Sequence, residues 1–271
     1  MFQDYLRFLE WGRAWLYGDY IGVYPLPMTA FFAFLSLLPW WLGYALLVAT
    51  SILILVRHLK WTAPLWFAYV PVLQVLLVGN IDIIWLGLYL IRTPLSLMLM
   101  TLKPQLFLFA LPEVWRLRGR WKEFLFWGAL LYLPAFLVRP NWVAEWIQLL
   151  RAQSRPAIGW SASIWGMPLY MIVAAILLGL AVLVKIKRAD WRPTLLFLDP
   201  AIAGYDYALL VGYTPLLIPL SWVCQYLEIT HHVFWPWALL GILAVPLSTP
   251  AIKETLSKVW TSCRGLKPGT A

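Results

Sequence analysis

Lys103 and Asp82 are the residues of this sequence whose types and surroundings point most directly to chemistry. Lys103 is followed by Pro104 and Gln105 in a stretch of Leu, Phe and Met, and Asp82 ends the polar segment Gly79-Asn80-Ile81-Asp82, also within apolar sequence. A charged group in such surroundings needs a partner, and inside a membrane it is a functional-site hypothesis by default. Pro104 removes a backbone donor and interrupts a helix. We therefore expect two helix breaks to bring an ammonium, an amide and a carboxylate together in a membrane.

The composition predicts an all-α, polytopic helical membrane protein. Only 12% of the 271 residues are charged and 62% are hydrophobic, whereas an ordinary soluble domain has about a quarter charged residues. The net charge of +9 does not indicate nucleic acid, because Lys and Arg gather in short loops at 57–60, 116–122 and 185–192, the bias typical of cytoplasmic loops. The spacing of the two cysteines fits neither a disulfide framework nor a metal site.

Placing the basic loops inside gives an order of segments. Residues 1–24 form a first external loop, 25–56 run inward and 64–78 return outward. The next pieces, 83–91, 94–102 and 107–115, have about nine residues each, or about 14 Å of helix, too short to cross a bilayer alone. We expect them to set the polar breaks in a protein-walled cavity that opens outward. Residues 124–138 then lead to a second external loop, 139–163.

Two segments have the pattern of helices that lie in the membrane interface. In the first loop the apolar face is expected to contain Phe2, Leu6, Leu9 and Leu16, and in the second Trp142, Trp146 and Leu149 recur at helical spacing. We interpret residues 1–252 as one integral membrane domain and 253–271 as a tail, whose side of the membrane stays open.

Several short motifs occur in an order that is similar to that of a known family. They are Asp4-Tyr5, Gly12-Arg13-Ala14, Tyr17-Gly18-Asp19-Tyr20, Tyr24-Pro25-Leu26-Pro27, Gly79-Asn80-Ile81-Asp82, Leu102-Lys103-Pro104-Gln105 and Tyr205-Asp206-Tyr207. Together they resemble the GT-C-type glycosyltransferases that use polyprenyl-phosphate sugars, especially the family-87 mannosyltransferase-like branch. The likeness extends over residues 4–215.

The resemblance implies an enzyme of the cell membrane whose active site faces outward. It would move a sugar, a mannose-like hexose, from a polyprenyl-phosphate carrier to a hydroxyl of a lipid or glycan acceptor. Asp4 matches the general base of the family, which takes the acceptor proton in an inverting displacement, and Lys103 would balance the charge of the leaving phosphate. The implied substrate contacts also include Gln105, Asn80, Asp82, Tyr205, Asp206 and Arg139. No cofactor is expected, and a requirement for a divalent metal stays open.

Each of these residues also has a structural explanation. Asp4 can interact with a helix dipole, and Lys103 can extend to the membrane surface. The others can cap helices, form turns or anchor a helix end: Asn80, Asp82, Asp199, Asp206 and Arg139.

Two alternatives to a membrane enzyme apply to the whole chain. Broken helices with charges near the midplane also build transporters, although the two halves of this chain have no matched breaks. Family members enter the first external loop from a preceding transmembrane helix, and none stands before Asp4 in this sequence. Either the true start lies upstream of Met1 or this is a truncated relative, and a truncated relative without catalysis is the second alternative.

Overall fold

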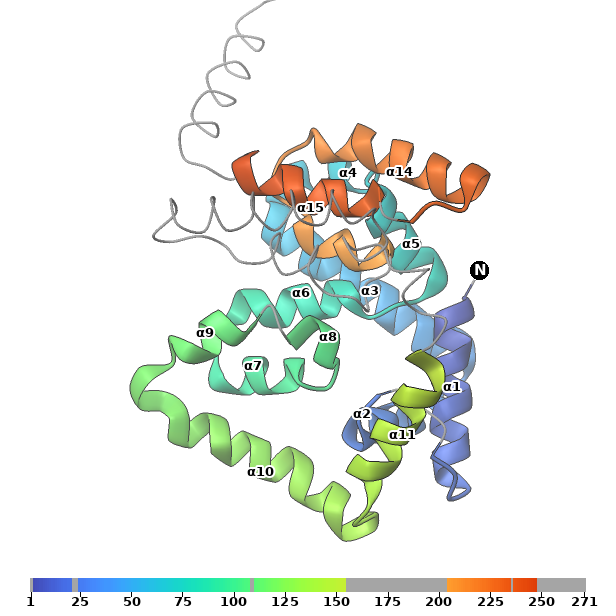
Figure 1. Ribbon diagram of the computed structural model, residues 1–271, viewed down its shortest axis with the longest axis vertical. Coiled ribbons are helices and arrows are strands. Elements are labelled where there is room, and N and C mark those ends of the chain that lie inside the picture. Colours follow the sequence, from blue (N-terminus) through green and yellow to red (C-terminus); the bar gives the residue numbers. More distant parts are fainter. Residues whose placement is uncertain (1, 21–23, 108–109, 155–203, 235, 248–271) are drawn as a thin grey trace, which may run out of the picture.

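The described part of the chain is entirely helical (Figure 1). The structure is a computed structural model that describes residues 2–20, 24–107, 110–154, 204–234 and 236–247, and these contain no β-strand. The longer helices are α1 (Gln3–Leu16), α2 (Leu26–Ser36), α3 (Trp40–Leu59), α5 (Val70–Val78), α6 (Asp82–Ile91), α7 (Pro94–Met100), α10 (Trp121–Val138), α11 (Trp142–Ser154), α14 (Leu217–His231) and α15 (Pro236–Leu247). The short ones are η1 (Lys60–Thr62), α4 (Ala63–Trp66), α8 (Pro104–Phe107), α9 (Leu111–Trp115), η3 (Arg118–Arg120) and η6 (Gly204–Leu210). The predicted all-α class is confirmed for these residues.

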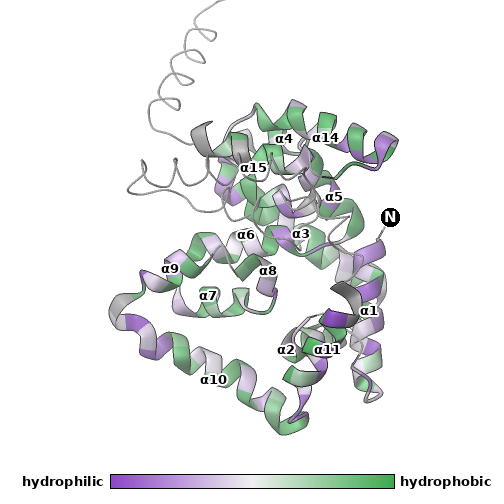
Figure 2. Ribbon diagram, in the orientation of Figure 1, coloured by the Kyte–Doolittle hydropathy of each residue, from purple (hydrophilic) through white to green (hydrophobic). Residues whose placement is uncertain are grey.

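Two helical stretches are long and apolar enough to cross a membrane. One is Trp40–Trp66 and the other is α10, and the bent pair of α5 and α6 would make a third. Only 11% of the residues of α10 are buried, and side chains such as Leu130 and Leu133 are more than half exposed. Figure 2 shows hydrophobic residues along much of α10 and α14. Exposed apolar surface of this kind is typical of helices that contact lipid or another protein.

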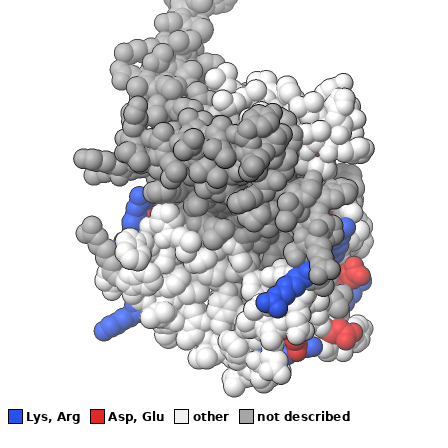
Figure 3. Space-filling model, in the orientation of Figure 1, with Lys and Arg blue, Asp and Glu red and all other residues white. Residues whose placement is uncertain are grey.

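Charged side chains lie at two opposite edges of the face drawn in Figure 3. One edge carries Lys and Arg near α9 and the beginning of α10, and the other carries both signs of charge over α1 and α11, with uncharged described surface between them. Helix α10 runs from the first edge to the second (Figure 1). Its 18 residues extend about 27 Å at the helical rise, which matches the hydrocarbon core of a bilayer.

Helices α1 and α11 lie at the same edge of the molecule, across the end of α10 (Figure 1). Helices were expected in both of these segments. Of the predicted apolar face of α1, Leu6 and Leu16 are about half exposed, which a helix lying in the interface allows. The packed face instead contains Tyr5, Phe8, Leu9 and Gly12, since Gly12 allows the backbone of α2 to approach closely.

The predicted inward span at 25–56 is two helices, α2 and α3, separated near Pro39. Proline cannot donate a backbone hydrogen bond, so α2 ends before it and α3 begins after it. The predicted return at 64–78 is interrupted as well, because α4 ends at Trp66 and α5 begins at Val70. Neither segment is the single helix that we expected.

The short segments in the middle of the chain agree better with the sequence. Helices α6 and α7 begin and end within two residues of the predicted pieces. Within the third piece, 107–115, the structure has α9, whereas α8 lies before it and ends at Phe107. Further along, the apolar run at 207–223 is divided between η6 and α14, with Gly212 at φ 87° between them. The run from 229 is divided at His232, which has φ 52°, between α14 and α15.

Candidate functional site

The break between α5 and α6 is built around Gly79. Gly79 has φ 77°, a left-handed conformation that glycine adopts without strain. The amides of Gly79 and Asn80 both donate to the Val75 carbonyl at 3.0 Å, which closes the end of α5. The chain then turns by 113° into α6. The side-chain oxygen of Asn80 accepts the Ile81 amide at 2.6 Å, so neither Asn80 nor Asp82 caps α6 with its side chain.

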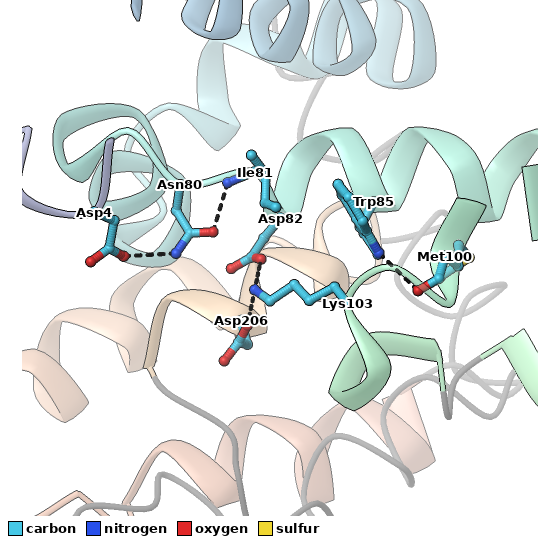
Figure 4. A network of polar contacts seen from close by, with 8 residues as sticks. All are labelled: Asp4, Asn80, Ile81, Asp82, Trp85, Met100, Lys103 and Asp206. Atoms are coloured by element: carbon cyan, nitrogen blue, oxygen red, sulfur yellow. Dashed lines mark hydrogen bonds and ion pairs between the residues drawn. The ribbon is translucent and has the colours of Figure 1, made fainter. Parts of the chain in front are cut away.

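Lys103 lies between two carboxylates (Figure 4). Its Nζ donates to Asp82 Oδ1 and, at 3.0 Å, to Asp206 Oδ1. The three side chains come from the first residue of α6, the turn before α8, and η6, and each is at most 3% exposed. The alternative that Lys103 extends to the membrane surface is therefore wrong. We name Asp82, Lys103 and Asp206 the buried triad.

Asp4 is joined to this break from α1. Asn80 Nδ2 donates to Asp4 Oδ2 at 2.8 Å, so Asn80 holds Asp4 with one side-chain atom and the Ile81 amide with another (Figure 4). Asp4 lies in the first turn of α1, its side chain 15% exposed, and Arg7 Nη1 lies 3.9 Å from its other oxygen. Five of the predicted site residues, Asp4, Asn80, Asp82, Lys103 and Asp206, thus lie at one place in the fold.

Among the remaining predicted residues, Arg139 makes its contacts away from this group. Arg139 follows α10 and pairs with Glu145 at 2.5 Å, while its Nη1 donates to the Gly18 carbonyl at 2.9 Å. It therefore joins the end of α10 to α11 and to the first loop. Gln105 and Tyr205 belong to α8 and η6, but their side chains lie outside the described part. Asp199, residues 155–163 of the second loop and the tail 253–271 also lie outside it.

Tyr24 was not among the predicted site residues. Tyr24 precedes α2 and is 7% exposed. Burial raises its pKa, the nearby Lys103 opposes this change, and Asp82, Asp206 and Asp4 raise the pKa further. The phenol therefore stays protonated and lies close enough to all four charged groups to sense them. The one sequence signal was its place in the motif Tyr24-Pro25-Leu26-Pro27, which by itself indicates no specific chemistry.

Formal charge at the site is negative, since three carboxylates face one ammonium. Asp82 Oδ2 is buried and has no hydrogen-bond partner. Among the residues that the structure describes, no group of three or more His, Cys, Asp or Glu side chains is arranged to hold a metal ion. The partly accessible Asp4 carboxylate can accept a proton from a hydroxyl, whereas the buried triad can fix the α5–α6 break and set the local potential.

No protein-family model, curated protein or solved structure matches this chain.

Proposed function

We propose that this protein is a membrane glycosyltransferase of GT-C architecture that moves a sugar from a polyprenyl-phosphate carrier to a hydroxyl of a lipid or glycan acceptor at the external face. The observation that carries the proposal is the 2.8 Å hydrogen bond between Asn80 and Asp4. This bond joins Asp4, on helix α1 at the edge of the molecule, to the polar break between the apolar helices α5 and α6. A lipid-borne sugar is a substrate that would meet both surroundings, since its chain stays in the membrane and its head group lies at the interface.

In this proposal Asp4 is the general base. The Asn80 amide fixes one carboxylate oxygen and leaves the other for the acceptor hydroxyl. As that hydroxyl attacks the anomeric carbon, its proton passes to Asp4, the bond to the carrier phosphate breaks, and the electron pair leaves with the phosphate. Removal of a general base costs about 10²–10⁴-fold in rate.

The leaving phosphate needs a cation close to the reacting carbon. The sequence indicated Lys103 for this role, but two carboxylates already balance its charge. Arg7 lies 3.9 Å from Asp4 and its side chain is 55% exposed. We therefore assign phosphate neutralisation to Arg7, and Lys103 keeps the α5–α6 break in place for Asn80.

The test is sugar transfer in membranes supplied with a polyprenyl-phosphate hexose and an acceptor extract. We expect Asp4→Asn to lower the rate about 10²–10⁴-fold, and Arg7→Ala to weaken use of the donor. Glu10→Gln and Arg13→Ala are matched controls, because both residues are exposed on the same helix, and they should leave the rate unchanged. Full transfer by Asp4→Asn would refute the assigned mechanism.

A second candidate, solute transport, is favoured by the buried triad beside the α5–α6 break, because broken helices and buried charges also form transporter sites. The two functions differ in their dependence on Asp4. Solute flux into proteoliposomes that is lost with Lys103→Ala and kept with Asp4→Asn would favour transport.

A further inference from the structure

Two arginines meet one buried carboxylate beside α9, at the basic edge of the molecule (Figure 3). Arg116 Nη1 donates to Glu113 Oε1 at 2.7 Å, and Arg92 Nε lies 3.9 Å from Glu113 Oε2. The Glu113 side chain is 9% exposed, whereas each arginine side chain is 49% exposed. One buried anion thus contacts two half-exposed guanidiniums, one at each oxygen. We name Arg92, Glu113 and Arg116 the arginine clamp.

Arg92 is held in place by its backbone and by a neighbouring ring. It ends α6 with φ 55°, a left-handed conformation that usually belongs to glycine or asparagine at a helix end. Its guanidinium carbon lies 5.4 Å from the centroid of the Tyr89 ring, within the range of a cation–π contact. A strained residue that its surroundings hold in place points to a function, and fixed guanidiniums lose little freedom when a ligand binds.

The two guanidiniums select a phosphate group as the ligand. Arginine carries five N–H donors in a planar fork. The contacts with Glu113 involve Nε of Arg92 and Nη1 of Arg116, and the other donors of each fork are available to a ligand. Such forks match the oxygens of a phosphate. The clamp also has a net positive charge, because two guanidiniums face one carboxylate, and this favours an anion.

The surroundings of the clamp select a phosphate that belongs to a lipid. Arg92 directly follows the apolar helix α6, and α10, which is long and apolar enough to cross a membrane, begins shortly after Arg116. Trp115 is 81% exposed and Ile91 is 62% exposed, and each precedes one of the arginines in the sequence. Tryptophan is enriched at the membrane interface, and basic groups at the ends of membrane helices bind anionic head groups.

We infer that the arginine clamp binds the phosphate head group of an anionic phospholipid in the leaflet at the basic edge. Arg92 and Arg116 donate hydrogen bonds to the phosphate oxygens, and Glu113 is a positioning residue that holds the two guanidiniums. The site goes beyond the proposed sugar transfer and does not depend on it, because Asp4 and the buried triad take no part.

The experiment measures binding of dioleoyl phosphatidylglycerol to the purified full chain in non-ionic detergent by native mass spectrometry. Dioleoyl phosphatidylcholine and inorganic phosphate are the comparison ligands, and both should bind more weakly. We expect Arg92→Gln and Arg116→Gln each to weaken phosphatidylglycerol binding about tenfold. The matched control is Lys122→Gln, which removes the same charge from an exposed residue at the same edge and should change the affinity less than about twofold.

Glu113→Gln separates a built clamp from simple attraction between opposite charges. This substitution makes the site more positive, so attraction alone predicts tighter binding of phosphatidylglycerol. The clamp predicts weaker binding, because the carboxylate that holds both guanidiniums is lost. Arg116→Lys keeps the charge and an ion pair with Glu113, and therefore the fold, but it should still weaken binding because lysine lacks the planar fork.

Four outcomes would overturn the inference while the proposed sugar transfer stands. They are tighter binding by Glu113→Gln, equal losses in Arg116→Gln and Lys122→Gln, full affinity in Arg116→Lys, and binding of phosphatidylglycerol no stronger than that of phosphatidylcholine or inorganic phosphate. Thermal unfolding of the same variants identifies a structural role. A lower unfolding temperature with unchanged lipid affinity would mean that the arginines only join α6 to α9, and it would overturn the inference as well.

Discussion

Lys103 is a buried cation whose two carboxylate partners come from distant parts of the sequence. Asp82 is 21 residues before it and Asp206 is 103 residues after it. Moving charges out of water is costly, and the mutual attraction of an ion pair offsets that cost only while the partners stay together. The stability of the fold therefore depends on all three members being present, because any member left alone would be an uncompensated buried charge.

This reasoning predicts a large effect from a single substitution and a small one from a combined one. Lys103→Ala should destabilise the protein by about 3–5 kcal/mol, because it leaves two buried carboxylates without their cation. Replacing all three members at once, by Lys103→Met with Asp82→Asn and Asp206→Asn, should recover most of that loss. Thermal unfolding of the purified protein measures both changes.

Lys122→Ala is the matched control, because Lys122 is exposed at the beginning of α10, and such surface substitutions stay within about 0.5 kcal/mol. Should Lys103→Ala unfold at the same temperature as Lys122→Ala, the buried triad would not contribute to stability.

At the scale of elements, three glycines fix the position of α1. A methyl group added at Gly12 would lie 2.4 Å from the Phe32 backbone, and one at Gly43 would lie 2.1 Å from the Tyr5 hydroxyl. At Gly79 it would lie 2.6 Å from Tyr5 Cβ. Helix α1 is thus seated directly on α2, α3 and the α5–α6 break, and this close seating allows the short Asp4 side chain to reach Asn80.

Gly79→Ala should therefore impair both stability and function. The left-handed backbone at Gly79 is unfavourable for alanine, with a cost of more than about 1 kcal/mol, and the added carbon would push Tyr5 away from the break. The Asp4–Asn80 contact should lengthen and sugar transfer should fall. Thermal unfolding and the transfer assay, applied to the same preparation, measure the two effects.

The corresponding change in a glycine without neighbours is Gly119→Ala, since nothing lies within 4 Å of a carbon added there. It should leave stability and transfer intact. If Gly79→Ala behaved like Gly119→Ala, close packing at the α5–α6 break would not position Asp4.

The sequence predicted some of these elements and not others, for physical reasons. Polar residues within apolar sequence marked the break at Gly79 and the turn at Pro104, because a charge or an unpaired backbone group in such surroundings demands local structure. The interruptions near Pro39 and after Trp66 carry no charged residue. An apolar run with a proline is compatible with one kinked membrane helix, so periodicity could not divide it.

Contacts between distant residues were the least predictable part of the site. Spacing along the chain could not pair Asp4 with Asn80, 76 residues away, or Lys103 with Asp206. Asp4 and Asp206 became candidates through resemblance to a family, while Asp82 and Lys103 stood out by themselves as charges in apolar sequence. Tyr24 belongs to a motif of that resemblance, but an uncharged aromatic residue before a proline is ordinary in apolar helical sequence and indicated no role.

At the scale of the whole molecule, the two charged edges and the uncharged surface between them predict an orientation in the membrane. Helix α10 connects the edges, and α1 with Asp4 lies at the edge opposite the basic turn of η3 (Figures 1 and 3). A substrate with a lipid tail and a sugar head would meet this second edge with its head group. The proposed function therefore requires that the two edges face opposite sides of the bilayer.

Cysteine labelling in sealed vesicles tests this orientation directly. In a background with Cys224→Ala and Cys263→Ala, single cysteines would replace Tyr17, Lys122 and Leu130. Tyr17 is 86% exposed at the edge of α1, Lys122 is exposed at the other edge, and Leu130 lies midway along α10.

A membrane-impermeant thiol reagent should label either Tyr17→Cys or Lys122→Cys in intact vesicles and both after the vesicles are made permeable. Leu130→Cys should stay unlabelled in both conditions, although the Leu130 side chain is 57% exposed. On our proposal lipid covers this position, and a thiol in hydrocarbon is neither ionised nor reached by a charged reagent. Labelling of Tyr17→Cys and Lys122→Cys from the same side would place Asp4 and the basic turn in one compartment, and α10 could then not cross the membrane.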